Sequence, residues 1–413
     1  MTPRPSRCLA PGALALGVAV SAMPCGAQEA PWLRPAAQAI GVVTRADPIP
    51  GGESRTEARI VQPLVMLQAG AFDHLRFLAT VNLEGATIRD GELAPGAWGE
   101  GFNDRRHPHT YAHELMLSGI DLLGSLDGDI RLAVAAGKGF APFGSDDPMS
   151  RPPLRYPVNH HLAQILERAL IMAGIRTGPV VLEGSVFNGD EPERPDQWPN
   201  MDRFGDSWSA RLTVLPASGV EASVSRAKVH SPEHRPGAGT DAWKWHAAVR
   251  LERVLLGQEL YGLLEWAETE EADGIFVFRS WLFEAAWRRG GHRPYYRFEQ
   301  TDRPEDMRTL DLFRSQRPHL ENSILGTTRF TVHTLGYQYD WGAPVADLHV
   351  SPFVEGTVGS ARNIDGGLLT PQILYGSDDV GSISAGLRIN WRLARHRMGR
   401  YGNLLNEAAH HGH

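Results

Sequence analysis

The stretch GSISAGLRINWRL, residues 381–393, alternates between apolar and polar side chains with a period of two. Ile383, Leu387 and Ile389 belong to the apolar set, while Ser384 and Arg388 belong to the polar set. This period is typical of an extended strand with one apolar and one polar face. A soluble sandwich buries the apolar face in a core, whereas a transmembrane barrel turns it toward lipid and lines an aqueous lumen with the polar face.

Other segments alternate in the same way and carry charges on their polar faces, among them residues 206–215, 243–252, 281–288 and 348–357. A sandwich of this length would need inner faces free of arginine and glutamate, so the pattern favours a barrel whose polar face lines the lumen. Tryptophans near the strand ends are typical of interfacial girdles. The predicted lumen charges are Arg211, Lys244, Arg250, Glu252, Glu284, Arg288, Arg297, Glu299, Glu355, Arg388 and Arg392.

These lumen charges allow two interpretations. Fixed charges can select ions in a pore, or the arginines and glutamates can pair with one another and fill the lumen. We expect Arg388 and Arg392, on the closing strand, to be the positive charges without a partner.

Short, turn-type links alternate with long polar segments from residue 58 onward. Residues 177–178, 217–218 and 257–258 form short links, whereas 85–110, 141–159 and 361–380 are long. Outer-membrane barrels connect their strands in this way, with short turns in the periplasm and long loops outside. Fifteen candidate strands lie between residues 58 and 393, and residues 37–47 supply a sixteenth. We therefore predict a single all-β transmembrane antiparallel barrel of about sixteen strands over residues 28–393.

One candidate strand is ambiguous. The periodicity of residues 162–175, LAQILERALIMAGI, fits a helix as well as a strand. Sequence alone leaves both alternatives open there.

The first residues resemble a secretory signal, which we expect to be cleaved after Ala27. Arg4 and Arg7 precede an apolar stretch over residues 9–23, and the only two cysteines, Cys8 and Cys25, lie in the same segment. The whole chain has a formal net charge of −7, and loss of the two arginines makes it more negative. This charge argues against a nucleic-acid partner.

The last predicted strand resembles the assembly signal of outer-membrane barrels at Ser384, Gly386, Ile389 and Trp391. The resemblance implies the barrel-assembly machinery as a partner. Residues 394–413 follow this strand as a basic, then histidine-rich tail, which we expect to hang free in the periplasm. The histidines at its end could bind divalent metal.

Several longer motifs resemble an uncharacterised family of Gram-negative outer-membrane β-barrels. They are DRRHPHTYAHELM (104–116), HH (160–161), LEGSVFNGDEPE (182–193), DSWSARL (206–212), SPEHRPG (231–237) and YYRFEQTD (295–302). The resemblance implies a barrel in the bacterial outer membrane, in contact with its lipid, and it carries no established substrate.

Three histidines, His107, His109 and His113, form the nearest approach to a metal cluster, with Glu114 beside them. Alternate residues of an extended segment point to one side, and imidazole suits zinc or copper. The adjacent histidines at 160 and 161 could add a ligand. The alternative is that these imidazoles only form structural hydrogen bonds to backbone and carboxylate groups.

The motif FGDSWS, residues 204–209, is similar to the nucleophile block of an esterase family in which Ser207 would attack an ester. That family also needs a late Asp-x-x-His pair, which is missing here, and a period of two places Ser207 on a lumen face. We therefore expect no enzyme and no cofactor, apart from a possible divalent metal at the loop histidines. The predicted function is porin-like passive passage of small polar or ionic solutes, with long loops folding in to narrow the mouth. A metal-binding surface protein and an outer-membrane hydrolase are the alternatives, and the oligomeric state stays open.

Overall fold

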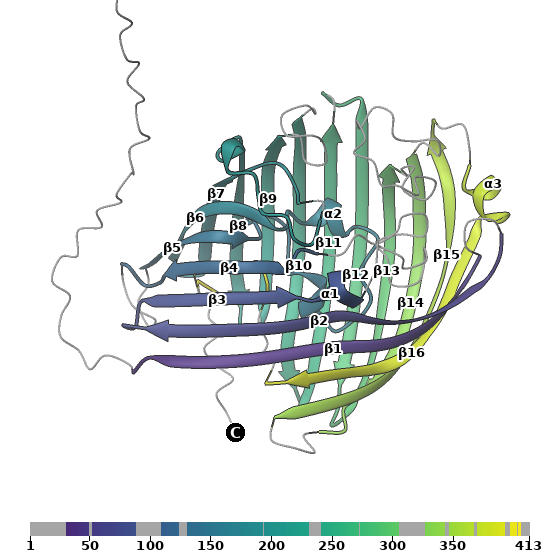
Figure 1. Cartoon of the computed structure of the whole chain (residues 1–413), viewed down its shortest axis with the longest axis horizontal. Helices are drawn as coiled ribbons and strands as arrows, with labels where there is room; N and C mark the ends of the chain where they lie inside the picture. The colour runs from purple at the N-terminus through teal and green to yellow at the C-terminus, as the bar shows by residue number, and fades with distance from the viewer. Residues whose placement is uncertain are drawn as a thin grey trace, which may run out of the picture.

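Sixteen antiparallel strands close into one barrel in the computed structural model (Figure 1). The structure describes residues 30–48, 52–87, 109–123, 130–192, 194–230, 241–271, 273–304, 327–342, 347–366, 370–392, 397–402 and 404–405. Each strand pairs with its neighbour in sequence, and β16 pairs with β1, which confirms the predicted fold. The strands are β1 Trp32–Asp47, β2 Arg55–Ala71, β3 Leu75–Asn82, β4 Ala112–Gly119, β5 Ile130–Gly139, β6 Arg168–Thr177, β7 Val180–Phe187, β8 Ser207–Ala217, β9 Val220–His230, β10 Asp241–Leu255, β11 Gln258–Glu271, β12 Phe276–Arg288, β13 His292–Pro304, β14 Thr327–Tyr339, β15 Leu348–Asp365 and β16 Asp379–Trp391.

The apolar face of the strands lies on the outside of the barrel. On β16, Ile383 and Leu387 are 59% and 43% exposed, whereas Ser384 and Arg388 are 2% and 8% exposed. The same alternation continues around the wall, where Leu335 is 66% exposed. An apolar outer band with a polar interior is the pattern of a transmembrane barrel.

The barrel closes where β1 meets β16, in a register that runs from Ala37 opposite Trp391 to Asp47 opposite Gly381. Gly386 is required at this seam. A Cβ atom there would lie 2.1 Å from the Gly41 carbonyl oxygen and 2.8 Å from the Phe353 ring. Glycine therefore allows the ring of the neighbouring strand to pack against the backbone.

Short connections lie mainly at one end of the barrel and long ones at the other, as predicted (Figure 1). The exception is the β11–β12 connection, which was expected to be a long loop over residues 268–273 but is confined to residues 272–275, because β11 continues to Glu271. The helical segments described are short: α1 (Glu84–Thr87), α2 (His160–Ala163) and α3 (Pro371–Tyr375), with 3₁₀ turns at Pro148–Ser150 and Met201–Arg203. In this part of the chain, no helix is long and apolar enough to cross a bilayer.

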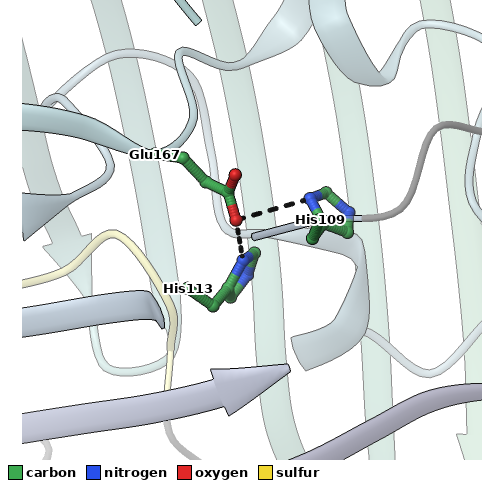
Figure 2. A group of neighbouring side chains, drawn as sticks. All are labelled: His109, His113 and Glu167. Atoms are coloured by element: carbon green, nitrogen blue, oxygen red, sulfur yellow. Dashed lines mark hydrogen bonds and ion pairs between the residues drawn. The ribbon is translucent and has the colours of Figure 1, made fainter. Parts of the chain in front are cut away.

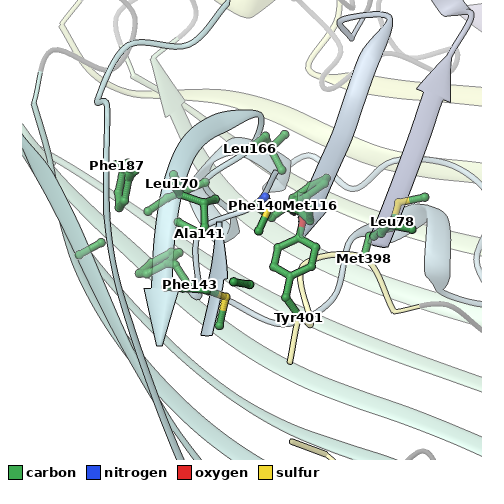
Figure 3. Close-up of a cluster of buried hydrophobic side chains, with 14 of the residues drawn as sticks. Leu78, Met116, Phe140, Ala141, Phe143, Leu166, Leu170, Phe187, Met398 and Tyr401 are labelled. Carbon is green, nitrogen blue, oxygen red and sulfur yellow. Dashed lines mark hydrogen bonds between the residues drawn. The ribbon is translucent and has the colours of Figure 1, made fainter. Parts of the chain in front are cut away.

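Residues 140–167, which we call the inner loop, fold into the barrel interior. Every residue of this loop is buried except Ser150, Pro152 and His161, which are partly buried. Phe140, Phe143 and other apolar residues of the loop pack in a cluster with residues of the wall (Figure 3). This placement resolves the ambiguous segment 162–175: its first residues belong to α2 and the end of the inner loop, and its second half to β6.

Part of the C-terminal tail also lies inside the barrel. Residues 397–402, 404 and 405, here called the terminal segment, include Met398, Tyr401, Leu404 and Leu405, which are at most 8% exposed. Met398 and Tyr401 pack in the same cluster as the inner loop (Figure 3). The expectation of a tail hanging free in the periplasm is therefore wrong for these residues. The histidines at 410, 411 and 413 lie outside the described residues, as do residues 1–27.

Candidate functional site: the filled barrel interior

The inner loop brings acidic and basic side chains against charges of the barrel wall. Arg151 lies 3.4 Å from Glu265 and 3.5 Å from Glu284, measured between guanidinium nitrogen and carboxylate oxygen. Glu284 also pairs with Arg297 at 2.7 Å. Because the side chains of all four residues are at most 1% exposed, this network joins the loop to β11, β12 and β13 in a buried region.

A second set of contacts holds the middle of the inner loop against the same wall. Arg297 donates to the Arg155 carbonyl oxygen at 2.7 Å, and Glu299 accepts from the Val158 amide at 2.5 Å. Arg155 donates to Thr357 on β15 at 3.1 Å. Wall charges thus serve as anchors for loop backbone.

Pairing also occurs within the wall itself. Arg211 forms a two-pronged contact with Glu183, at 2.7 and 2.9 Å, and Tyr295 donates to Glu355 at 2.9 Å. Between the wall and the inner loop, Lys244 donates to the His161 carbonyl oxygen at 3.0 Å. Charge-assisted bonds of this kind are about twice as strong as neutral ones. The arrangement is that of charges that fill and brace a lumen.

Arg250 is a further buried anchor of the inner loop, whereas the predicted lumen charges Glu252, Arg288 and Arg392 are at least partly exposed. Arg250 contacts both Asp146 of the inner loop and Glu252, whose side chain is 38% exposed. Arg288 is partly exposed and contacts Glu259 and Asp340.

Arg392 corrects the prediction of an unpaired lumen charge. It follows the last residue of β16 in a left-handed conformation, with φ +51°, and its exposed side chain pairs with Asp347 at 2.9 Å. The strand ends one residue earlier, so the period of two no longer sets the direction of this side chain. Arg388 does face inward and donates to the Gln38 side-chain oxygen at 2.9 Å. Among the described residues, no carboxylate lies within ion-pair distance of Arg388.

The terminal segment is tied to both the inner loop and the wall. Arg397 contacts Asp146 through two bonds of 2.7 Å and contacts Glu221 on β9 through two more, one of them at 2.8 Å. The Tyr401 hydroxyl donates to Glu114 at 2.7 Å and accepts from the Phe140 amide at 3.0 Å. Burial raises the pKa of Tyr401, which keeps the donor proton in place.

His109 and His113 converge on a carboxylate that the sequence did not indicate. His113 Nδ1 lies 2.6 Å from Glu167 Oε1, and His109 Nδ1 lies 3.8 Å from the same oxygen (Figure 2). Glu167 is the last residue of the inner loop, 54 positions from His113. The predicted neighbour Glu114 instead accepts hydrogen bonds from Tyr401 and from Thr80. His107 lies outside the described residues.

A bulge explains why His113 and Glu114 both point inward. Thr80 of β3 pairs with Glu114, but Val81 pairs with Ala112, so His113 is an extra residue without a cross-strand partner. A bulge of this kind changes the direction of one side chain and commonly lies next to a functional site. Strict alternation along β4 would have placed His113 on the lipid side.

Ser207 has structural contacts. Its hydroxyl donates to Asp206 at 2.8 Å and accepts from the His230 amide at 2.9 Å, and the His230 ring pairs with Asp241 at 2.7 Å. These bonds hold the start of β8 to the end of β9 and account for the burial of the Ser207 hydroxyl.

The fold of the chain is that of the outer-membrane porins. An anion-selective porin from Comamonas acidovorans matches over 88% of this chain and 100% of its own, with TM-score 0.51 and 11% identity. OmpF from Salmonella typhi, in a complex with daunomycin, covers 87% of this chain and 97% of its own, with TM-score 0.52 and 9% identity. OprB from Pseudomonas putida covers 87% and 94%, with TM-score 0.51 and 12% identity. No family model and no curated protein matches the chain.

Proposed function

We propose that the protein is a porin-type channel of the bacterial outer membrane that passes small polar or ionic solutes by diffusion. The observation that carries this proposal is a closed sixteen-stranded barrel with an apolar exterior and a charged interior. A barrel of this size encloses enough space for an aqueous path. The solved structures with the same fold support the proposal, since one of them is an anion-selective porin by name.

We further propose that passage through this channel is narrow and controlled by what fills the lumen. The inner loop enters from the end with long loops, and the terminal segment follows β16 from the end with short turns. Arg397 joins the two at Asp146. Because charges of both signs are paired there, the filled region acts mainly as a steric restriction, and Arg388 is the interior cation best placed to attract anions.

Single-channel recording in a planar bilayer tests both statements. The refolded chain is expected to give small discrete conductance steps. A chain that ends at residue 396, and so lacks the terminal segment, should give larger ones. Absence of steps from both proteins, when each is shown to be folded and inserted, would contradict the channel. Equal steps from both would contradict the restricting role of the terminal segment.

A further inference from the structure

His109, His113 and Glu167 form a buried group of metal-ligating side chains inside the barrel (Figure 2). Each offers one ligand atom, and these three atoms lie within 4.8 Å of one another. The residues are at most 2% exposed. We refer to them as the His-His-Glu cluster.

The surrounding chain orients the carboxylate of this cluster. The Thr110 amide donates to both Glu167 oxygens, at 3.1 and 3.2 Å. Glu167 itself adopts a left-handed backbone conformation, with φ +53°. Non-glycine residues adopt this conformation rarely and at a cost, and such residues gather at functional sites. Together with the bulge at His113, two local irregularities of the backbone aim side chains at one point.

Electrostatics at the cluster favour a cation overall. The carboxylate of Glu114, next to His113, also lies in the interior, and Asp147 lies 3.5 Å from His160, whose ring stands 5.9 Å from that of His109. The opposing charges are Lys138, whose ammonium group donates to the Thr110 hydroxyl, and Arg168, which contacts a further carboxylate, Glu191, at 3.5 Å. Among the described residues, three carboxylates therefore lie around three imidazoles, against one basic side chain that has no carboxylate of its own and one that has.

We propose that the His-His-Glu cluster binds one Zn²⁺ ion. Two imidazole nitrogens and one carboxylate oxygen are a donor set that zinc accepts, with water as the fourth ligand. Ligands at about 2.1 Å from a tetrahedral ion are about 3.4 Å apart. The 3.8 Å between His109 Nδ1 and Glu167 Oε1 is already close to this value.

Zinc must replace the direct contact between His113 and Glu167. Their 2.6 Å separation has to widen by about 0.8 Å to admit the ion. Nδ1 of His113 must also present a lone pair, which requires the neutral tautomer with its proton on Nε2. Among the described residues, Nε2 of His113 has no hydrogen-bond partner, so no existing contact of Nε2 opposes its taking the proton when the ion replaces the bond between Nδ1 and Glu167. The bound ion would then fasten the end of the inner loop to β4.

Calorimetric titration of the refolded chain with Zn²⁺ tests the proposal. The background protein carries His410→Ala, His411→Ala and His413→Ala, because these three residues could bind metal independently. We expect one Zn²⁺ per chain. His113→Ala should abolish binding. Glu167→Gln, which keeps the size of the side chain, should weaken binding by about 10- to 100-fold or more. That range is typical when only a partner of a metal ligand is replaced, and Glu167 would be a ligand itself.

A matched control is His333→Ala. This histidine is exposed on the outer face of the barrel. Its ring contacts Tyr296 and Phe298 there. Its loss should leave the affinity unchanged. Co²⁺ in place of Zn²⁺ adds a spectroscopic measurement, because a four-coordinate site gives visible absorption that His113→Ala should remove.

The proposal is overturned if the background protein binds no Zn²⁺, or if folded Glu167→Gln and His113→Ala bind it with unchanged affinity. Heat-modifiable migration in gels reports whether each variant is a folded barrel. Because binding is measured directly, the result is independent of whether the barrel conducts.

Discussion

Replacing Arg397 by alanine should release the terminal segment from the barrel interior. Arg397 bridges Asp146 of the inner loop and Glu221 of the wall, and its side chain is only 11% exposed. Breaking a buried ion pair costs about 3–5 kcal/mol. The lower value applies here because Arg250 and Arg400 still contact Asp146 when Arg397 is gone.

The free energy lost with the Arg397 ion pairs is large compared with the free energy that keeps the terminal segment docked. Ordering the eight described residues costs on the order of 10 kcal/mol in backbone entropy. Apolar burial of Met398, Leu404 and Leu405 offsets much of that cost, so the net docking free energy is a small difference. A change of about 3 kcal/mol raises the undocked population roughly 150-fold.

The population can be measured as cysteine reactivity. Both native cysteines precede residue 28, so Met398→Cys introduces the sole thiol in a chain that begins there. Met398 is 4% exposed, and a maleimide can reach position 398 only when the segment is undocked. Labelling of Met398→Cys/Arg397→Ala should be about two orders of magnitude faster than labelling of Met398→Cys alone.

The control is Met398→Cys/Arg392→Ala, which removes an exposed ion pair worth at most about 1 kcal/mol. Its labelling rate should match that of Met398→Cys. If Arg397→Ala changes the rate by less than about threefold in a folded barrel, Arg397 does not hold the segment and our reasoning fails.

Three further substitutions test other parts of the structure. Gly386→Val should prevent closure of the β1–β16 seam, because the Cβ atom of the valine would overlap the Gly41 carbonyl oxygen. The failure would be seen as loss of the heat-modifiable band in gels, and normal folding would refute the account of the seam. Leu335→Arg places a charge on the lipid face and should lower the free energy of unfolding by about 2–4 kcal/mol, the cost of an arginine near the bilayer centre. Urea unfolding in lipid measures this change, and an unchanged free energy of unfolding would contradict the outward orientation of Leu335. Arg388→Gln should shift the reversal potential in a salt gradient toward cations, and an unchanged potential would remove Arg388 from the solute path.

The strand pattern was predictable because it depends on local geometry. Ile383 and Ser384 point to opposite faces in any strand, so alternation alone separates the lipid face from the lumen face. Arg211, Arg297 and Glu355 were placed inside by the same argument. The alternation argument failed at Arg392, because β16 ends one residue before it.

The candidate site was only half predictable. His109 and His113 drew attention as metal-ligating residue types close together in the sequence. Glu167 gave no comparable signal, because it lies within an apolar segment that reads equally well as helix or strand. Glu183 could have been found, since it occupies an inward position of β7 beside outward Leu182. Nothing in the sequence of the tail indicated that Tyr401 returns to the interior.

The number of strands, the faces they present and the general order of short and long connections could all be predicted, because each follows from side-chain direction and turn chemistry over a few residues. What occupies the lumen depends instead on contacts between distant parts of the chain. The bond between Arg397 and Asp146 joins residues 251 positions apart, and the Tyr401–Glu114 bond joins residues 287 apart. Such contacts exist only after the barrel has closed and offered buried partners to the inner loop and the terminal segment, so no local pattern encodes them.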